Sequence, residues 1–104
     1  LDQPRLALPY FQRSIELNET DAEAKFHYGL ALAGAEMYDM AIEAWKKTLE
    51  VDENHADAYF NLGGAYGGKK GDVNKAIELF EKALEIQPDH MLAANGLKQM
   101  KELS

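Results

Sequence analysis

Apolar residues recur along this chain at spacings of three and four positions, which bring side chains onto one face of an α-helix. Such amphipathic stretches cover, in approximate bounds, residues 4–17, 22–34, 38–51, 56–67 and 73–86. A sixth stretch opens at Pro88–Asp89 and ends near Leu103. No window alternates apolar and polar residues with a period of two, so the pattern predicts no β-strand. We therefore expect an all-α chain of about six helices.

Capping and helix-breaking residues mark the ends of these stretches. Thr20 and Asp21 can cap the helix that begins at residue 22, and Asp72 can cap the helix that begins at residue 73. Pro4 lies near the start of the first stretch, where the missing N–H of proline costs nothing. Pro9 lies inside that stretch, so it should bend or strain the first helix.

The chain repeats itself. Residues 22–55 align with residues 56–90, and the second copy is one residue longer because of its Gly/Lys-rich turn at residues 67–71. Upstream, residues 6–18 align with residues 40–52, and downstream residues 91–103 fit the first half of a further copy. One helical hairpin cannot bury its own apolar face, so the copies are expected to stack on one another.

Several small and aromatic residues return at equivalent places of the two copies. The pairs are Gly29 and Gly63, Ala41 and Ala76, Trp45 and Phe80, and His55 and His90. A glycine inside a helix costs about 1 kcal/mol relative to alanine, which is tolerable where two helices must approach closely. Trp45 and Phe80 offer the large apolar area needed to fill the space between neighbouring repeats.

Glycine at the eighth place, alanine at the twentieth, an aromatic residue at the twenty-fourth and Pro88 near the end resemble the tetratricopeptide repeat. Residues 6–18 and 86–93 further resemble the C-terminal repeats of Bacillus-type tetratricopeptide proteins, which implies a bacterial origin. The fourth place, often Trp in the family, is Lys25 in one copy and Tyr59 in the other. The resemblance implies a right-handed α-solenoid of stacked helix-turn-helix repeats.

On this basis we expect a single domain. Residues 1–21 would form the second helix of a partial repeat, residues 22–55 and 56–90 two full repeats, and residues 91–104 a C-terminal capping helix. Because Leu1 falls in the middle of a repeat, we expect the chain to be a piece of a longer protein. The first helix would then lack its own partner helix, which predicts weak self-association through it.

Composition narrows the classes of function. The chain has no cysteine, which excludes disulfides and thiolate metal sites and weakly favours a reducing cytoplasm. No run of about 18 apolar residues is present, so we expect no membrane span. The net charge of −7 would repel a phosphate backbone, so nucleic-acid binding is not expected. This acidity otherwise indicates solvated helix faces.

In the tetratricopeptide family, the first helix of each repeat lines a concave groove. The resemblance places nine residues there as a peptide-binding groove: Glu23, Phe26, His27, Leu30, Asp57, Phe60, Asn61, Gly64 and Asn95. Their helical spacing supports one shared face, opposite Tyr59 and Leu62. Phe26 and Phe60 are expected on a face that the core does not need, where they would contact an extended peptide or a helix. The alternative is that both rings pack along the superhelix.

The resemblance implies a non-enzymatic protein–protein interaction module that binds a peptide or helix of a partner. A self-assembly scaffold, built by end-to-end stacking of repeats, is the alternative. Some family members hold acidic tails in a clamp of Lys, Asn and Arg, but only Asn61 matches that clamp here. His27, His55 and His90 lack metal-ligand spacing, so no metal or other cofactor is expected. No nucleophile lies in a catalytic motif, so we expect no enzyme activity.

Overall fold

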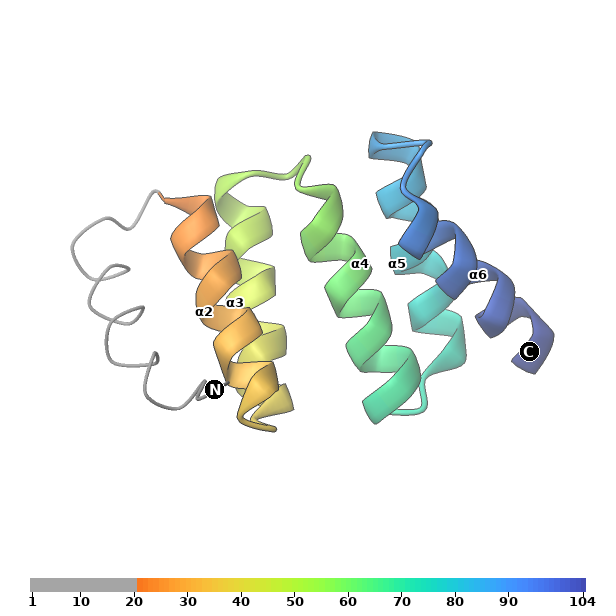
Figure 1. Ribbon diagram of the computed structural model, residues 1–104, viewed down its shortest axis with the longest axis horizontal. Helices are drawn as coiled ribbons and strands as arrows, with labels where there is room; N and C mark the ends of the chain where they lie inside the picture. The colour runs from red at the N-terminus through yellow and green to blue at the C-terminus, as the bar shows by residue number, and fades with distance from the viewer. Residues whose placement is uncertain (1–20) are drawn as a thin grey trace. The chain divides into compact units, whose positions relative to one another are not determined.

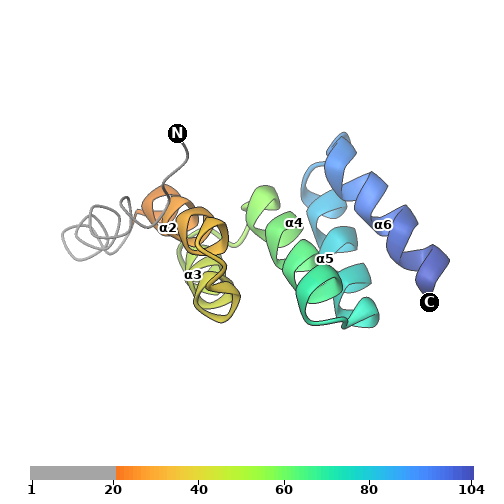
Figure 2. The same cartoon turned by 60° about the horizontal axis from the view of Figure 1, so that its bottom comes forward.

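A computed structural model describes residues 21–104 of the chain, and these divide between two compact units, residues 21–53 and 54–104. The first unit contains α2 (Ala22–Gly34) and α3 (Tyr38–Val51), and the second contains α4 (Ala56–Gly64), a π-helix η1 (Ala65–Lys69), α5 (Val73–Ile86) and α6 (Met91–Leu103). Figures 1 and 2 show that each unit is built from antiparallel neighbouring helices. Residues 21–104 contain no strand, which agrees with the all-α prediction.

The predicted helix at residues 4–17, the bend at Pro9 and self-association through that helix fall on residues 1–20. They lie outside the described residues, so they stay predictions. Among the helices that are described, α2, α3 and α5 have the predicted bounds.

The first unit is a hairpin closed by small residues. The N–H of Ala24 donates to Asp21 Oδ1 at 3.1 Å, so Asp21 caps α2 as predicted. Trp45 of α3 lies directly over Gly29 of α2, where an added Cβ would stand 2.3 Å from Trp45 Nε1. The predicted close approach at Gly29 is therefore confirmed. Trp45 was predicted to fill the space between neighbouring repeats, and the structure shows that it packs against α2 within its own repeat.

The turn between α2 and α3 contains a backbone conformation that is unusual for its residue. Glu36 has a φ of 64°, and Gly71, at the equivalent place of the second copy, has a φ of 69°. Only glycine adopts this left-handed region without a steric cost from Cβ. The first copy thus closes the same turn as the second, but with a less suitable residue.

The second unit is a three-helix arrangement in which α5 packs against both α4 and α6 (Figures 1 and 2). Its core is formed by buried Ala76, Phe80, Ala83 and Ala93. Phe80 lies between two glycines, because a Cβ on Gly63 or on Gly96 would come within 2.7 Å or 2.8 Å of its ring. The narrow residues on α4 and α6 therefore let one phenylalanine hold three helices together.

Two helix ends differ from the sequence prediction. The helix expected over residues 56–67 ends at Gly64 and continues as a π-helix, in which the N–H of Lys70 donates to the carbonyl of Ala65 at 3.1 Å. A π-turn accommodates one residue more than an α-turn, so it absorbs the extra residue of the second copy. The last helix begins at Met91, not at Pro88, because His90 caps it through Nδ1, which accepts from the N–H of Ala93 at 3.1 Å.

Candidate functional site

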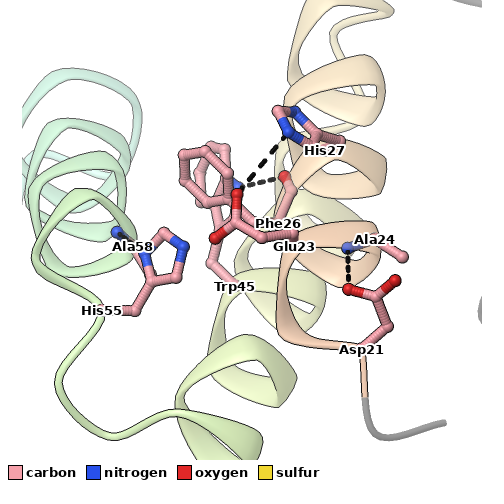
Figure 3. A network of polar contacts seen from close by, with 8 residues as sticks. All are labelled: Asp21, Glu23, Ala24, Phe26, His27, Trp45, His55 and Ala58. Carbon is pink, nitrogen blue, oxygen red and sulfur yellow. Dashed lines mark hydrogen bonds and ion pairs between the residues drawn. The ribbon is translucent and has the colours of Figure 1, made fainter.

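Four of the nine predicted groove residues lie on α2 in the first unit. Glu23 and His27 are exposed and lie one helical turn apart, with 3.7 Å between Glu23 Oε2 and His27 Nε2 (Figure 3). Leu30 follows on the next turn and is 41% exposed. Glu23, His27 and Leu30 thus form an exposed face of α2 that has two polar side chains and one aliphatic side chain.

Phe26 departs from the prediction. Its side chain is only 8% exposed, so the expectation that the core leaves this ring free is wrong. The ring meets the imidazole of His27 edge-on, with 5.5 Å between the ring centres. The backbone carbonyl of Phe26 accepts a hydrogen bond from Trp45 Nε1 at 3.2 Å, which links α2 to α3 (Figure 3). The hydrophobic pattern did not predict the burial of Phe26, because the ring shares its helix face with polar residues and is covered through tertiary packing, which residue spacing does not encode.

The described residues also form a pocket of about 350 Å³ in the first unit, but none of the predicted α2 residues lines it. Its walls include Tyr28 and Leu32 of α2 and Met40 and Ala44 of α3. Tyr28 and Leu32 lie, in helical register, on the side of α2 opposite Glu23 and His27.

Asp57, the first predicted groove residue of the second unit, is engaged by a buried histidine. Asp57 Oδ1 lies 2.8 Å from Nε2 of His90, which is 6% exposed. His90 Nδ1 accepts from the N–H of Ala93, so the proton of the neutral ring must lie on Nε2 and point to Asp57. His90 therefore joins the start of α6 to α4, and Asp57 has one oxygen committed to it.

Phe60 is half-buried and lies against two rings. Its centre is 5.2 Å from that of His90 and 5.8 Å from that of Phe80, with tilted planes in both cases. Phe60 is therefore in contact with two other rings, which favours a fixed apolar surface. The alternative prediction, that this ring packs within the repeat array, thus applies to the buried part of the Phe60 side chain.

Phe60, Gly64 and Asn95 line a common pocket of about 430 Å³, which we call the α4–α6 pocket. Asn61 is half-buried on α4 and is not among its described lining residues. Seven residues outside the nine predicted ones also line this pocket: Gly63, Gly68, Phe80, Leu92, Gly96, Gln99 and Met100. The face shared by Leu92, Asn95, Gly96 and Gln99 could have been found from helical spacing alone. Phe80 and Met100 could not, because their spacing assigns them to the core.

The chemistry of the α4–α6 pocket is apolar with neutral polar edges. Its floor is aromatic and aliphatic, and among the described lining residues only Asn95 and Gln99 have side-chain amides that can form hydrogen bonds. The described lining residues include no lysine, arginine or carboxylate. Such a surface can bury an apolar side chain while the amides donate to and accept from a peptide backbone.

The three described histidines have structural partners. His55 Nδ1 accepts from the N–H of Ala58 at 3.1 Å, so it caps α4 as His90 caps α6 (Figure 3). Within residues 21–104, no group of three or more His, Asp or Glu side chains could hold a metal ion. None of the helices in this part of the chain is long and apolar enough to cross a membrane.

Known proteins share this architecture. A family model of the tetratricopeptide repeat matches residues 20–89. The crystal structure of YrrB, a Bacillus-type tetratricopeptide protein described as having an unusual peptide-binding site, superposes with a TM-score of 0.87 at 49% identity, over 92% of this chain and 49% of that one. MamA superposes with a TM-score of 0.89 at 30% identity, over 95% of this chain and 57% of that one.

The chain thus spans about half the length of both solved chains. The tetratricopeptide domain of Arabidopsis OM64 shares only the fold, with a TM-score of 0.90 at 21% identity, over 96% of this chain and 82% of that one. No curated protein matches the sequence.

Proposed function

We propose, from the premise that this chain belongs to the tetratricopeptide repeat family, that it binds a segment of a partner protein in the α4–α6 pocket. The observation that carries the proposal is the meeting of three predicted groove residues, Phe60, Gly64 and Asn95, at one apolar hollow. A peptide-binding site in YrrB, which is 49% identical over most of this chain, supports the same class of ligand.

The pocket favours an uncharged, bulky side chain as the anchor of the ligand. Phe60 and Phe80 offer aromatic surface, and Leu92 adds an aliphatic wall that is 61% exposed. Gly64 leaves the approach open, because an added Cβ would meet no described atom within 4 Å. The amides of Asn95 and Gln99 would then hold the backbone beside the anchor.

The charges near the pocket argue against an acidic ligand. The one charged residue among those predicted for the groove on α4 is the acid Asp57, and the described lining has no cation that could hold a carboxylate. The whole chain carries a net charge of −7, which adds long-range repulsion of acidic peptides. A neutral or basic peptide with an apolar anchor is therefore the ligand of this pocket.

The test uses the full chain and a displayed library of random linear peptides. Selected peptides are synthesised, and their binding to two variants, Leu92→Asp and Met91→Asp, is measured by fluorescence anisotropy. Both residues are exposed on the first turn of α6, and both variants add the same charge, but only Leu92 lines the pocket. Binding should weaken on the order of tenfold or more in Leu92→Asp, as for a buried hot-spot contact, and stay within about twofold in Met91→Asp.

Equal losses in the two variants would place the peptide elsewhere. Light scattering on the same samples separates the alternative, a self-assembly scaffold. A mass that rises with concentration, together with a library that yields no binder, would favour stacking between chains over peptide binding.

A further inference from the structure

A second hollow in the second unit lies away from the α4–α6 pocket. It has a volume of about 430 Å³ and is lined by Leu84 of α5 and by Ala94, Leu97, Lys98, Lys101 and Glu102 of α6. We call it the α5–α6 pocket. On a helical projection, Ala94, Leu97 and Lys101 fall on the side of α6 opposite Leu92 and Asn95. The two pockets therefore use different faces of the same helix, and a ligand can occupy one without touching the other.

The floor of the α5–α6 pocket is aliphatic. Leu84 and Leu97 are half-buried and pack against the core formed around Phe80, so they are fixed in position. Ala94 is exposed beside them and leaves room above the two leucines. The pocket thus presents an apolar seat whose shape is set by the core of the unit.

The rim of this pocket carries positive charge in an otherwise acidic chain. Lys98 and Lys101 lie one helical turn apart, and neither forms an ion pair with a described residue. By contrast, Lys75 and Lys82 of α5 each have a glutamate three residues further on, with N–O distances of 3.9 Å and 3.5 Å. Glu102 also stands on the rim, so the local balance is two cations to one anion.

The repeat register bears on one possible occupant of the α5–α6 pocket, a further helix of the repeat array. Lys98 stands at the eighth place of its unit, where the two full copies have Gly29 and Gly63. Those glycines let Trp45 and Phe80 come so close that an added Cβ would stand 2.3 Å and 2.7 Å from their rings. A lysine at this place prevents an aromatic ring from approaching as closely, so this face of α6 does not suit a helix packed as α3 and α5 are packed.

We propose that the α5–α6 pocket docks an acidic amphipathic helix of a partner protein. A leucine-sized side chain of the partner would lie between Leu84 and Leu97, and carboxylates one turn apart would meet Lys98 and Lys101. The charge complementarity selects this partner, because the rim offers two cations that form no ion pair with a described residue, on a chain whose net charge of −7 otherwise repels acidic segments. This surface is separate from the proposed peptide pocket and does not depend on it.

The probes are two designed helical peptides of about 18 residues, long enough to be partly helical in water. Both carry the same leucine stripe, but one has glutamates and the other lysines along its flanks. Binding to the full chain is measured by anisotropy at about 0.15 M salt, where long-range attraction is largely screened. The acidic peptide should bind at least about tenfold more tightly than the basic one.

Two charge-reversed variants of the protein make the test specific. Lys98→Glu/Lys101→Glu removes the proposed rim, and Lys75→Glu/Lys82→Glu makes the same change in net charge on α5. We expect the first to lose the acidic peptide on the order of tenfold and to gain the basic one, and the second to change either by less than about twofold. Leu92→Asp should leave the acidic peptide bound, which separates this surface from the α4–α6 pocket.

Three results would overturn the proposal. They are the absence of binding of the acidic peptide to the wild-type chain, equal binding of the two peptides, and equal losses in the two charge-reversed variants. Far-UV circular dichroism of each variant confirms that the helices persist. All four lysines are on helix surfaces, so their replacement leaves the core in place.

Discussion

Two adjacent glycines at the end of α4 should respond in opposite ways to the same substitution. Replacing either Gly63 or Gly64 by alanine gains the helix propensity of alanine, about 1 kcal/mol in a helix interior and less near its end. At Gly64 an added Cβ meets no described atom within 4 Å, and the backbone is helical with φ −62° and ψ −41°. We therefore expect Gly64→Ala to raise the free energy of unfolding by up to about 1 kcal/mol.

At Gly63 the same Cβ would stand 2.7 Å from Cε1 and 2.8 Å from Cδ1 of Phe80. The ring cannot move away freely, because Gly96 of α6 also lies close to it: a Cβ added there would stand 2.8 Å from Cζ of Phe80. Overpacking of a tight core costs about 1–3 kcal/mol, and the confinement of Phe80 favours the upper part of that range. After the propensity gain is subtracted, Gly63→Ala should lower the free energy of unfolding by about 1–2 kcal/mol.

The assay is urea denaturation followed by far-UV circular dichroism, with thermal melts as a second measurement. For a domain of this size, 1 kcal/mol corresponds to a shift of about 4–8 °C in Tm, so the two variants should melt on opposite sides of the wild type. Unchanged m-values would show that the difference lies in the folded state. A Gly63→Ala variant as stable as Gly64→Ala would refute the argument that Phe80 is clamped between two glycines.

Three further substitutions test other parts of the fold. Glu36→Gly should raise the free energy of unfolding by about 0.5–1 kcal/mol, because glycine relieves the left-handed φ of 64°; a lower Tm would contradict this. His90→Asn should be more stable than His90→Ala by about 1 kcal/mol in urea titrations, because asparagine still caps α6; equal losses would mean that the cap contributes nothing. Trp45→Phe should lower the free energy of unfolding by about 1–3 kcal/mol, because it loses both the hydrogen bond to the Phe26 carbonyl and contacts of the indole ring. Since Trp45 is the one tryptophan of the chain, unfolding is followed by circular dichroism, and a neutral result would show that the hydrogen bond is dispensable.

The amphipathic spacing determined the helices because it is a local property. The bounds of α2, α3 and α5 follow from apolar residues at three- and four-residue steps together with caps such as Asp21 and Asp72. The end of α4 was not predictable in this way. The local pattern leaves the place of the one extra residue open within the turn. In the structure it is taken up in a π-turn, where Gly67 packs close to Met100 and Ala76.

The candidate site shows a similar division. The family resemblance, supported by helical register, predicted Phe60, Gly64 and Asn95 as groove residues, and these three line one pocket. The burial of Phe26 and the engagement of Asp57 by His90 involve side chains brought together from different elements. Their separation in sequence, 33 residues for Asp57 and His90, leaves no periodic signal.

The sequence by itself determined that this chain is helical, that it repeats, and that glycines must allow helices to approach at two equivalent places. These conclusions rest on spacing and residue size, which the order of amino acids specifies directly. Only the tertiary structure decided which side chains remain accessible: it buried Phe26, packed Phe60 against two rings, and left Lys98 and Lys101 on the rim of an apolar pocket. Accessibility depends on what a neighbouring element covers, and that is settled when the helices pack.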